Sequence, residues 1–128
     1  MSKPLAEKLS LKPGLRTYWM GMPDDVDEVL REALAQTTFA EDNLDWVHLF
    51  SNVYAELEAF LHFIQPKLRM NGCIWVSWYK KTAQLPTELD YSRIQTLGLR
   101  MGLVDVKVCA VSDEWSAVKF MYRRKDRS

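Results

Sequence analysis

The chain has 128 residues, of which 48% are hydrophobic and 27% charged, and its formal net charge is zero. One globular domain with an apolar core fits this length, and the balanced charge argues against a general nucleic-acid binder, which needs a basic excess. No apolar run approaches the roughly 18 residues of a membrane-spanning helix, and the start lacks a secretion signal. Cys73 and Cys109 show neither metal spacing nor a CxxC pattern, so we expect free thiols in the cytoplasm.

Strand and helix patterns alternate along the first half of the chain. A lead-in helix and turn fill residues 1–14, and strand patterns follow at 15–20, 37–40 and 44–50. Two helices are predicted between and after these strands, the first capped by Asp24 or Asp25 and the second by Asn52. Their apolar faces are Val26, Val29, Leu30, Ala33 and Leu34 in the first, and Val53, Leu57, Phe60, Leu61 and Ile64 in the second.

The second half continues the alternation and ends in a hairpin. Asn71-Gly72 predicts a turn into a continuous apolar strand at 73–78, which is typical of a strand covered on both faces. Asp90 is expected to cap a helix that Gly102 closes. Residues 104–111 alternate with a period of two, which indicates an edge strand. A loop at 112–114 then leads into a returning strand at 115–122 and a frayed tail at 123–128.

These patterns predict one α/β domain, a three-layer sandwich around a mostly parallel sheet with a C-terminal antiparallel β-hairpin. Class I methyltransferases also end with an edge strand, a tight hairpin and a final strand that inserts beside its parallel neighbours. The chain therefore resembles a truncated, Rossmann-like class I methyltransferase. This resemblance concerns the fold and does not by itself assign an activity.

The turn after the first strand occupies the position of a cofactor loop. A dinucleotide-binding turn needs three glycines, whereas this turn has Gly21 alone, followed by Met22 and Pro23. Asp24 and three further acidic residues crowd the start of the next helix, where they stabilise the helix end and repel a phosphate. We interpret Gly21 and Asp24 as a vestigial cofactor loop, with S-adenosylmethionine, whose sulfonium is cationic, as the alternative ligand.

A second candidate site lies at the carboxyl end of the apolar strand, where ligands of open α/β sheets gather. Lysines beside aromatic side chains suit an acidic ligand or a stacked base, or else form a solvated loop whose lysines pair with acidic residues of the hairpin. The residues predicted to bind a ligand or partner here are Trp78, Lys80, Lys81, Asp113, Trp115 and Ser116.

Catalytic and metal motifs are weak in the sequence. In the segment Ser51-Asn52-Val53-Tyr54, only Tyr54 matches the Asn/Asp-Pro-Pro-Tyr motif of amino-methyltransferases, and a helix-face tyrosine explains it equally. His48 and His62 show no metal spacing with a cysteine or with each other, although a Cys–His pair stays open. We predict no catalytic residue and no metal ligand.

The segment 102–124, GLVDVKVCAVSDEWSAVKFMYRR, resembles the end of the bacterial domain-of-unknown-function family DUF 3052. Residues 4–14 and the stretch 74–81, IWVSWYKK, also resemble that family. Two positions depart from its pattern, because Tyr79 replaces a proline and Ala117 replaces a glycine. The resemblance implies a small Rossmann-like domain without an assigned activity.

We therefore expect a non-catalytic cytoplasmic module that binds a small molecule or a protein. General nucleic-acid binding and membrane binding are not expected, and no cofactor is predicted. A divergent S-adenosylmethionine-dependent methyltransferase is the alternative. A homodimer through strand 104–111 stays open, although Asp105 and Lys107 are charges that discourage edge pairing.

Overall fold

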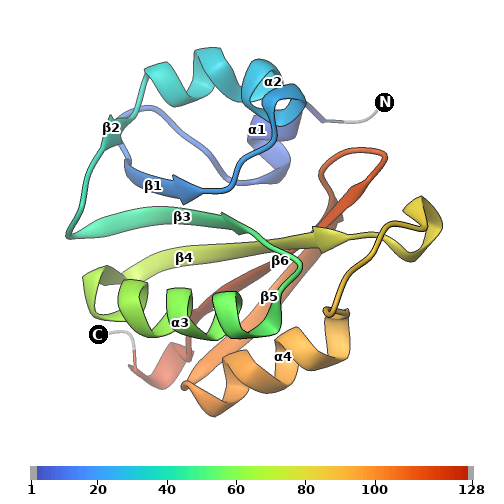
Figure 1. Ribbon diagram of the computed structural model, residues 1–128. Coiled ribbons are helices and arrows are strands. Elements are labelled where there is room, and N and C mark those ends of the chain that lie inside the picture. The colour runs from blue at the N-terminus through green and yellow to red at the C-terminus, as the bar shows by residue number, and fades with distance from the viewer. Residues whose placement is uncertain (1–2, 127–128) are drawn as a thin grey trace.

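The computed structural model describes residues 3–126 and contains one six-stranded sheet with helices on both faces (Figure 1). The strands are β1 (Arg16–Met20), β2 (Thr38–Phe39), β3 (Leu44–Phe50), β4 (Leu68–Tyr79), β5 (Leu103–Ala110) and β6 (Trp115–Tyr122). The helices are α1 (Leu5–Lys8), α2 (Asp24–Ala35), α3 (Tyr54–Ile64) and α4 (Tyr91–Arg100), with 3₁₀ turns η1 (Gln65–Lys67), η2 (Lys81–Ala83) and η3 (Arg124–Asp126).

The strand order is β2-β1-β3-β4-β6-β5. The first four strands in this order are parallel, and β6 is antiparallel to both of its neighbours, β4 and β5. The last strand therefore inserts beside the parallel strands and leaves β5 at the edge, as predicted. Val106, Lys107 and Val108 of this edge strand are all exposed, so the predicted alternation of an apolar and a wet face fails there, where the pairing with β6 is irregular between Asp105 and Lys107.

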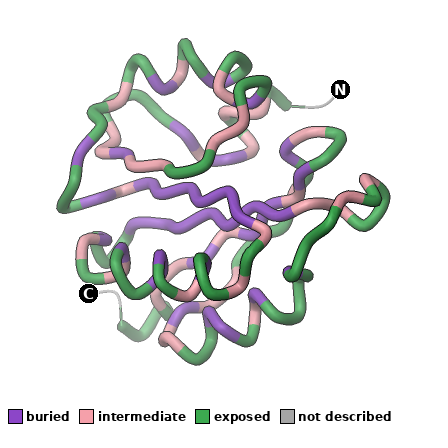
Figure 2. Tube along the Cα trace, viewed as in Figure 1, coloured by how far each residue is buried: buried purple, intermediate pink, exposed green. Residues whose placement is uncertain are grey.

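Two apolar cores lie on opposite faces of the sheet, because side chains of a strand alternate between its faces. One core joins α1 and α2 to the sheet and contains Trp46, Phe50 and Trp75. The other joins α3 and α4 to the sheet and contains Val47, Leu49 and Phe120, among others. Figure 2 shows the buried residues concentrated along β3 and β4, the strands that both cores share.

The N-terminal segment, residues 4–14, is part of the first core. Leu9 is fully buried, and its carbonyl oxygen accepts hydrogen bonds from the indole nitrogens of Trp46 (2.8 Å) and Trp75 (2.9 Å). Lys107 Nζ donates to the carbonyl oxygen of Lys8 at 3.1 Å. The segment predicted as a lead-in therefore completes the polar contacts of two buried tryptophans on β3 and β4.

Several local predictions are confirmed. Asp90 is the N-cap of α4, where its Oδ1 accepts a hydrogen bond from the Arg93 backbone N–H at 2.8 Å. Gly102 follows α4 with a φ of +84°, a conformation that glycine adopts readily. Pro66 stands in η1, directly after the end of α3. The short strand expected within 37–40 is β2.

Two predicted caps and one predicted turn are wrong, and Val29 and Val53, predicted on the apolar faces of their helices, are 65% and 45% exposed. Neither Asp24 nor Asp25 caps α2, which begins after Pro23 without a side-chain hydrogen bond. Asn52 does not cap α3; its Oδ1 accepts a hydrogen bond from the Tyr79 backbone N–H at 2.8 Å and so ties the end of β3 to the end of β4. Asn71-Gly72 is not a turn but lies within β4, in the irregular stretch between the Leu44–Leu68 and Trp46–Cys73 pairs, where a Cβ atom built on Gly72 would lie 2.8 Å from the Leu44 carbonyl oxygen.

The ends of the chain complete this description. Residues 124–126 of the tail predicted to fray form η3, and residues 1–2 and 127–128 lie outside the described part. No helix within residues 3–126 combines the length and apolar character needed to cross a bilayer.

Candidate functional site

The turn between β1 and α2 is closed by the backbone of β3. Gly21 has a φ of +76°, and a Cβ atom built on it would lie 2.5 Å from the carbonyl oxygen of Phe50. Glycine is needed here because two strand ends approach each other, so its presence does not require a ligand. Met22 packs against the core on the α1/α2 face.

The start of α2 carries a concentration of negative charge. Asp24, Asp25 and Asp27 stand in its first turn, and only Asp27 forms an ion pair within the described residues, with Arg31 at 3.6 Å. A phosphate group would meet these carboxylates as well as the positive end of the helix dipole. The turn therefore does not fit a dinucleotide or any other phosphate ligand.

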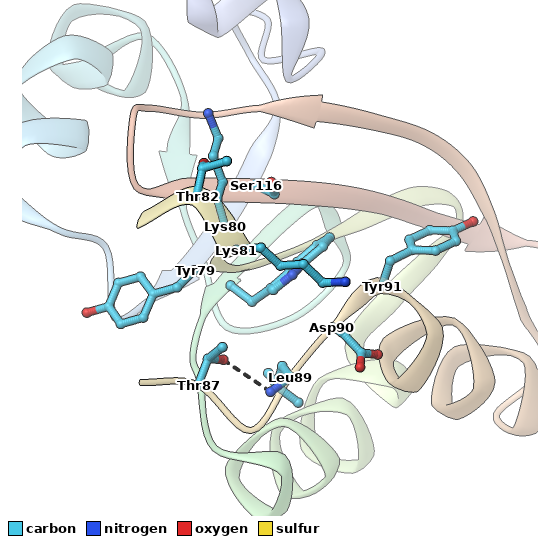
Figure 3. A pocket seen from close by; sticks show the side chains of 10 residues that line it. Tyr79, Lys80, Lys81, Thr82, Thr87, Leu89, Asp90, Tyr91 and Ser116 are labelled. Carbon is cyan, nitrogen blue, oxygen red and sulfur yellow. Dashed lines mark hydrogen bonds between the residues drawn. The ribbon is translucent and has the colours of Figure 1, made fainter. Parts of the chain in front are cut away.

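A pocket of about 520 Å³ opens at the carboxyl end of β4, between that strand, the loop that follows it and the start of α4 (Figure 3). Four of the predicted site residues line it: Trp78, Lys80, Lys81 and Ser116. The structure adds six lining residues that were not among the predicted ligand-binding residues: Tyr79, Thr82, Thr87, Leu89, Asp90 and Tyr91.

The apolar base of this pocket is firmly held by the core. Trp78 and Leu89 are 7% and 4% exposed and belong to the core on the α3/α4 face. The Thr87 hydroxyl accepts a hydrogen bond from the Leu89 backbone N–H at 3.1 Å, and Asp90 caps α4. Thr87 and Asp90 at the rim are thus tied by hydrogen bonds to the segment that packs on this core.

Tyr91 stands at the rim of the pocket, at the first position of α4. Its hydroxyl donates a hydrogen bond to the Asp105 carboxylate on β5, which raises the pKa of Tyr91. Because this contact orients the ring, the ring can offer an aromatic surface to a ligand.

The two lysines of the pocket are not neutralised by the hairpin. The Lys80 backbone N–H donates to the carbonyl oxygen of Glu114 at 2.9 Å, so the loop after β4 does lie beside the hairpin. The ion pairs of residues 3–126, however, are Arg16–Asp42, Arg31–Asp27 and Arg69–Asp45, and none involves Lys80 or Lys81. In Figure 3 the Lys81 side chain extends across the pocket with its nitrogen toward Tyr91 and Asp90, while the Tyr79 ring points away.

The other two predicted site residues lie elsewhere. Trp115 is buried on the opposite face of the sheet, edge-on to Phe50 at 5.2 Å between ring centroids and 4.5 Å from the Tyr79 ring. Asp113 lines a separate cleft of about 530 Å³ with Asp25 and Glu114, between the start of α2 and the hairpin loop. The single site predicted from the sequence is therefore two sites, one with lysines and one with carboxylates.

The buried pair of His48 and Ser77 is the closest histidine–hydroxyl contact of the described chain. His48 Nε2 and Ser77 Oγ are 2.7 Å apart, both residues are fully buried, and His48 Nδ1 has no hydrogen-bond partner. Burial lowers the pKa of His48 to about 3, so the ring is neutral near pH 7. Because no surface reaches this pair, it links β3 to β4 inside the sheet and is not positioned to contact a substrate.

The remaining candidates also have structural surroundings. His62 is exposed on α3, and Tyr54 packs partly buried against the α3/α4 core. Both cysteines are free thiols, and burial raises the pKa of Cys73 to about 11. No group of three His, Cys, Asp or Glu side chains in residues 3–126 is arranged to hold a metal ion.

No family model and no curated protein matches the sequence, whereas solved structures match the fold. A protein described as a type 11 methyltransferase from Sulfolobus solfataricus is similar with a TM-score of 0.64 and 12% identity, over 93% of this chain and 89% of that one. An S-adenosylmethionine-dependent methyltransferase from Aquifex aeolicus gives 0.60 and 12%, over 93% and 88%. A precorrin-6y C5,15-methyltransferase from Geobacter metallireducens gives 0.60 and 11%, over 93% and 86%.

Identities this low establish the fold and not the activity. The predicted fold class is confirmed: the chain has a compact version of the Rossmann-like fold of class I methyltransferases.

Proposed function

We propose that the chain is a non-catalytic binding module whose ligand occupies the pocket at the carboxyl end of β4. The proposed ligand is a small molecule with an anionic group on an apolar or planar body. The observation that carries this proposal is the union of Lys81, which forms no ion pair within residues 3–126, with an aromatic base in one pocket.

The chemistry of the lining supports this ligand class. Lys81 supplies positive charge across the pocket, whereas the Lys80 side chain extends away from it (Figure 3), and the hydroxyl groups of Thr82 and Ser116 can donate hydrogen bonds to an anion. Trp78 offers an apolar surface for the body of the ligand. The volume of about 520 Å³ lies within the roughly 300–1,000 Å³ that is usual for pockets of small molecules.

Binding without catalysis agrees with the position of the reactive side chains. The His48–Ser77 pair is sealed inside the sheet. The cofactor position after β1 is narrowed by the contact between Gly21 and Phe50 and is surrounded by carboxylates. We propose a cytoplasmic location and membership of the DUF 3052 family on the sequence patterns described above.

S-adenosylmethionine binding is the second candidate function, and the acidic cleft favours it. Asp25, Asp113 and Glu114 line this cleft beside the β1–α2 turn, and their negative charge suits a cationic sulfonium. The fold shared with methyltransferases supports the same candidate. The cleft fits S-adenosylmethionine in charge but not in shape. The β1–α2 turn beside it has one glycine, Gly21, and the side chains of Met22 and Pro23 occupy space that a cofactor loop leaves open.

Loss of the Lys81 charge is expected to weaken anion binding in the pocket. We expect benzoate or adenosine monophosphate to raise the melting temperature of the wild-type protein, and Lys81→Ala to weaken the affinity at least about tenfold, as for a hydrogen bond to a charged group. Isothermal titration calorimetry measures the affinity. Lys125→Ala, an exposed lysine in η3 remote in sequence from the pocket, is the matched control and should bind as the wild type does.

The same experiment separates the two candidates. Equal binding by wild type and Lys81→Ala would contradict the pocket assignment. Stabilisation by S-adenosylmethionine and S-adenosylhomocysteine that is lost in Asp113→Asn and kept in Lys81→Ala would replace the binding-module proposal with the second candidate.

A further inference from the structure

An apolar groove between β1 and α3 is exposed on the α3/α4 face of the sheet. It has a volume of about 360 Å³ and is lined by Tyr18, Met20, Glu56, Ala59, Phe60 and Phe63. Met20, Phe39 and Phe63 are 42%, 54% and 51% exposed. The Tyr18 ring lies 5.3 Å from the Phe39 ring and 6.4 Å from the Phe63 ring, so these aromatic side chains form one continuous surface.

The groove exists because of the short connection between β2 and β3. Residues 40–43 cross from one strand to the other without a helix, so α3 and α4 are the only helices that cover this face within residues 3–126. Both pack on the core built by β3, β4 and β6, whereas Tyr18 on β1 is partly buried and Phe39 on β2 is exposed. Exposed aromatic clusters of this kind mark interaction surfaces.

The outward row of α3 carries opposite charges at its two ends. Glu56, Ala59 and Phe63 lie three and four residues apart and so share one helical face, and Lys67 continues the row in η1. Lys67 Nζ lies 5.0 Å from the centre of the Phe63 ring. Glu56 and Lys67 are eleven residues apart, about 16 Å along a helix, so they cannot pair with each other.

The row of Glu56, Ala59, Phe63 and Lys67 is complementary in charge and size to an antiparallel copy of itself. About a two-fold axis between Ala59 and Phe63, an antiparallel copy of α3 places its own lysine opposite Glu56 and its own phenylalanine opposite Ala59. The small Ala59 side chain leaves the groove open to receive that ring. We propose that this groove binds a second copy of the chain, with Phe63 inserted reciprocally and Glu56 paired with Lys67 of the other copy.

The β5 edge is a poorer place for this contact. Asp105 and Lys107 place charges on that strand, and its pairing with β6 is irregular between the same two residues. Charges and bulges on an edge strand oppose strand-to-strand association. The α3 face therefore replaces strand 104–111 as the expected surface of a homodimer.

Sedimentation equilibrium tests the proposal on the full chain. The wild-type protein should show a mass approaching twice 15.0 kDa as its concentration rises to about 200 μM. Phe63→Asp should weaken dimerisation at least about tenfold, because it removes the aromatic anchor of the interface. Val108→Asp, an exposed apolar residue on the β5 edge with 53% exposure, is the matched control and should dimerise as the wild type does.

A charge exchange tests the orientation of the two copies. Glu56→Lys and Lys67→Glu should each weaken the dimer, and the double variant should restore it, because each copy then offers the reversed pair. Thermal unfolding of every variant shows that the fold persists. A monomeric wild type at 200 μM, an unaffected dimer in Phe63→Asp, a dimer lost in Val108→Asp, or a double variant weaker than both single variants would each overturn the proposal.

Discussion

Gly21→Ala is expected to lower the free energy of unfolding by about 3 kcal/mol or more. The new Cβ would lie 2.5 Å from the carbonyl oxygen of Phe50, and the residue would keep a φ of +76°. Forcing an L-residue into a left-handed conformation costs about 1–3 kcal/mol, and displacing packed backbone costs a further amount of similar size. Urea denaturation followed by tryptophan fluorescence measures the change.

Gly14→Ala is the matched control for this substitution. Gly14 has a φ of +84°, but a Cβ atom built there meets no atom within 4 Å. Gly14→Ala should therefore lower the free energy of unfolding only by the cost of placing alanine in a left-handed conformation, about 1–3 kcal/mol. Equal losses in the two variants would contradict the close approach of Gly21 to Phe50 and would reopen the β1–α2 turn as a ligand loop.

The free energy of unfolding is expected to decrease as the pH is lowered from about 6.5 to about 3, because of His48. Burial lowers the pKa of His48 from 6.5 to about 3, so the folded protein holds the neutral ring while the unfolded chain takes up a proton. The contribution of neutral His48 is complete above pH 6.5 and is lost as the pH falls toward 3. One linked proton changes the free energy of unfolding by about 1.4 kcal/mol per pH unit.

The comparison of two histidine variants isolates this effect. Urea denaturation at several pH values between 6.5 and 5 gives the slope of stability against pH. His48→Gln should reduce that slope by most of one proton, whereas His62→Gln, at an exposed position on α3, should leave it unchanged. A slope that is the same in His48→Gln and the wild type would mean that His48 is protonated in the folded state.

The sequence predicts elements well where local signals decide them. The Asp90 cap and the glycine after α4 both act within a few residues, and the structure contains each of them. Asn52 and Asn71-Gly72 mislead because their partners are distant. The Asn52 side chain bonds to Tyr79, 27 residues away, and Asn71-Gly72 lies in a bulged stretch of β4 because β3 pairs with the residues on either side of it, Leu68 and Cys73.

The candidate site was predicted in part for the same reason. The rule that ligands gather at the carboxyl ends of parallel strands correctly joins Trp78, Lys81 and Ser116. Trp115 was grouped with Ser116 because the two are neighbours in sequence, yet adjacent residues of a strand face opposite sides of the sheet. Applying that alternation to β6 would have separated them. Thr87 and Tyr91 join the site through the path of the loop, which no local pattern specifies.

The double hydrogen bond to Leu9 determines when the N-terminal segment can dock during folding. Its two indole donors stand 37 and 66 residues later in the chain, on adjacent parallel strands. A ribosome therefore releases residues 5–11 long before their partners exist, and contacts at such separation close large loops. The segment that is synthesised first makes both of these hydrogen bonds only once β3 and β4 lie side by side, so its docking depends on a contact between two later strands.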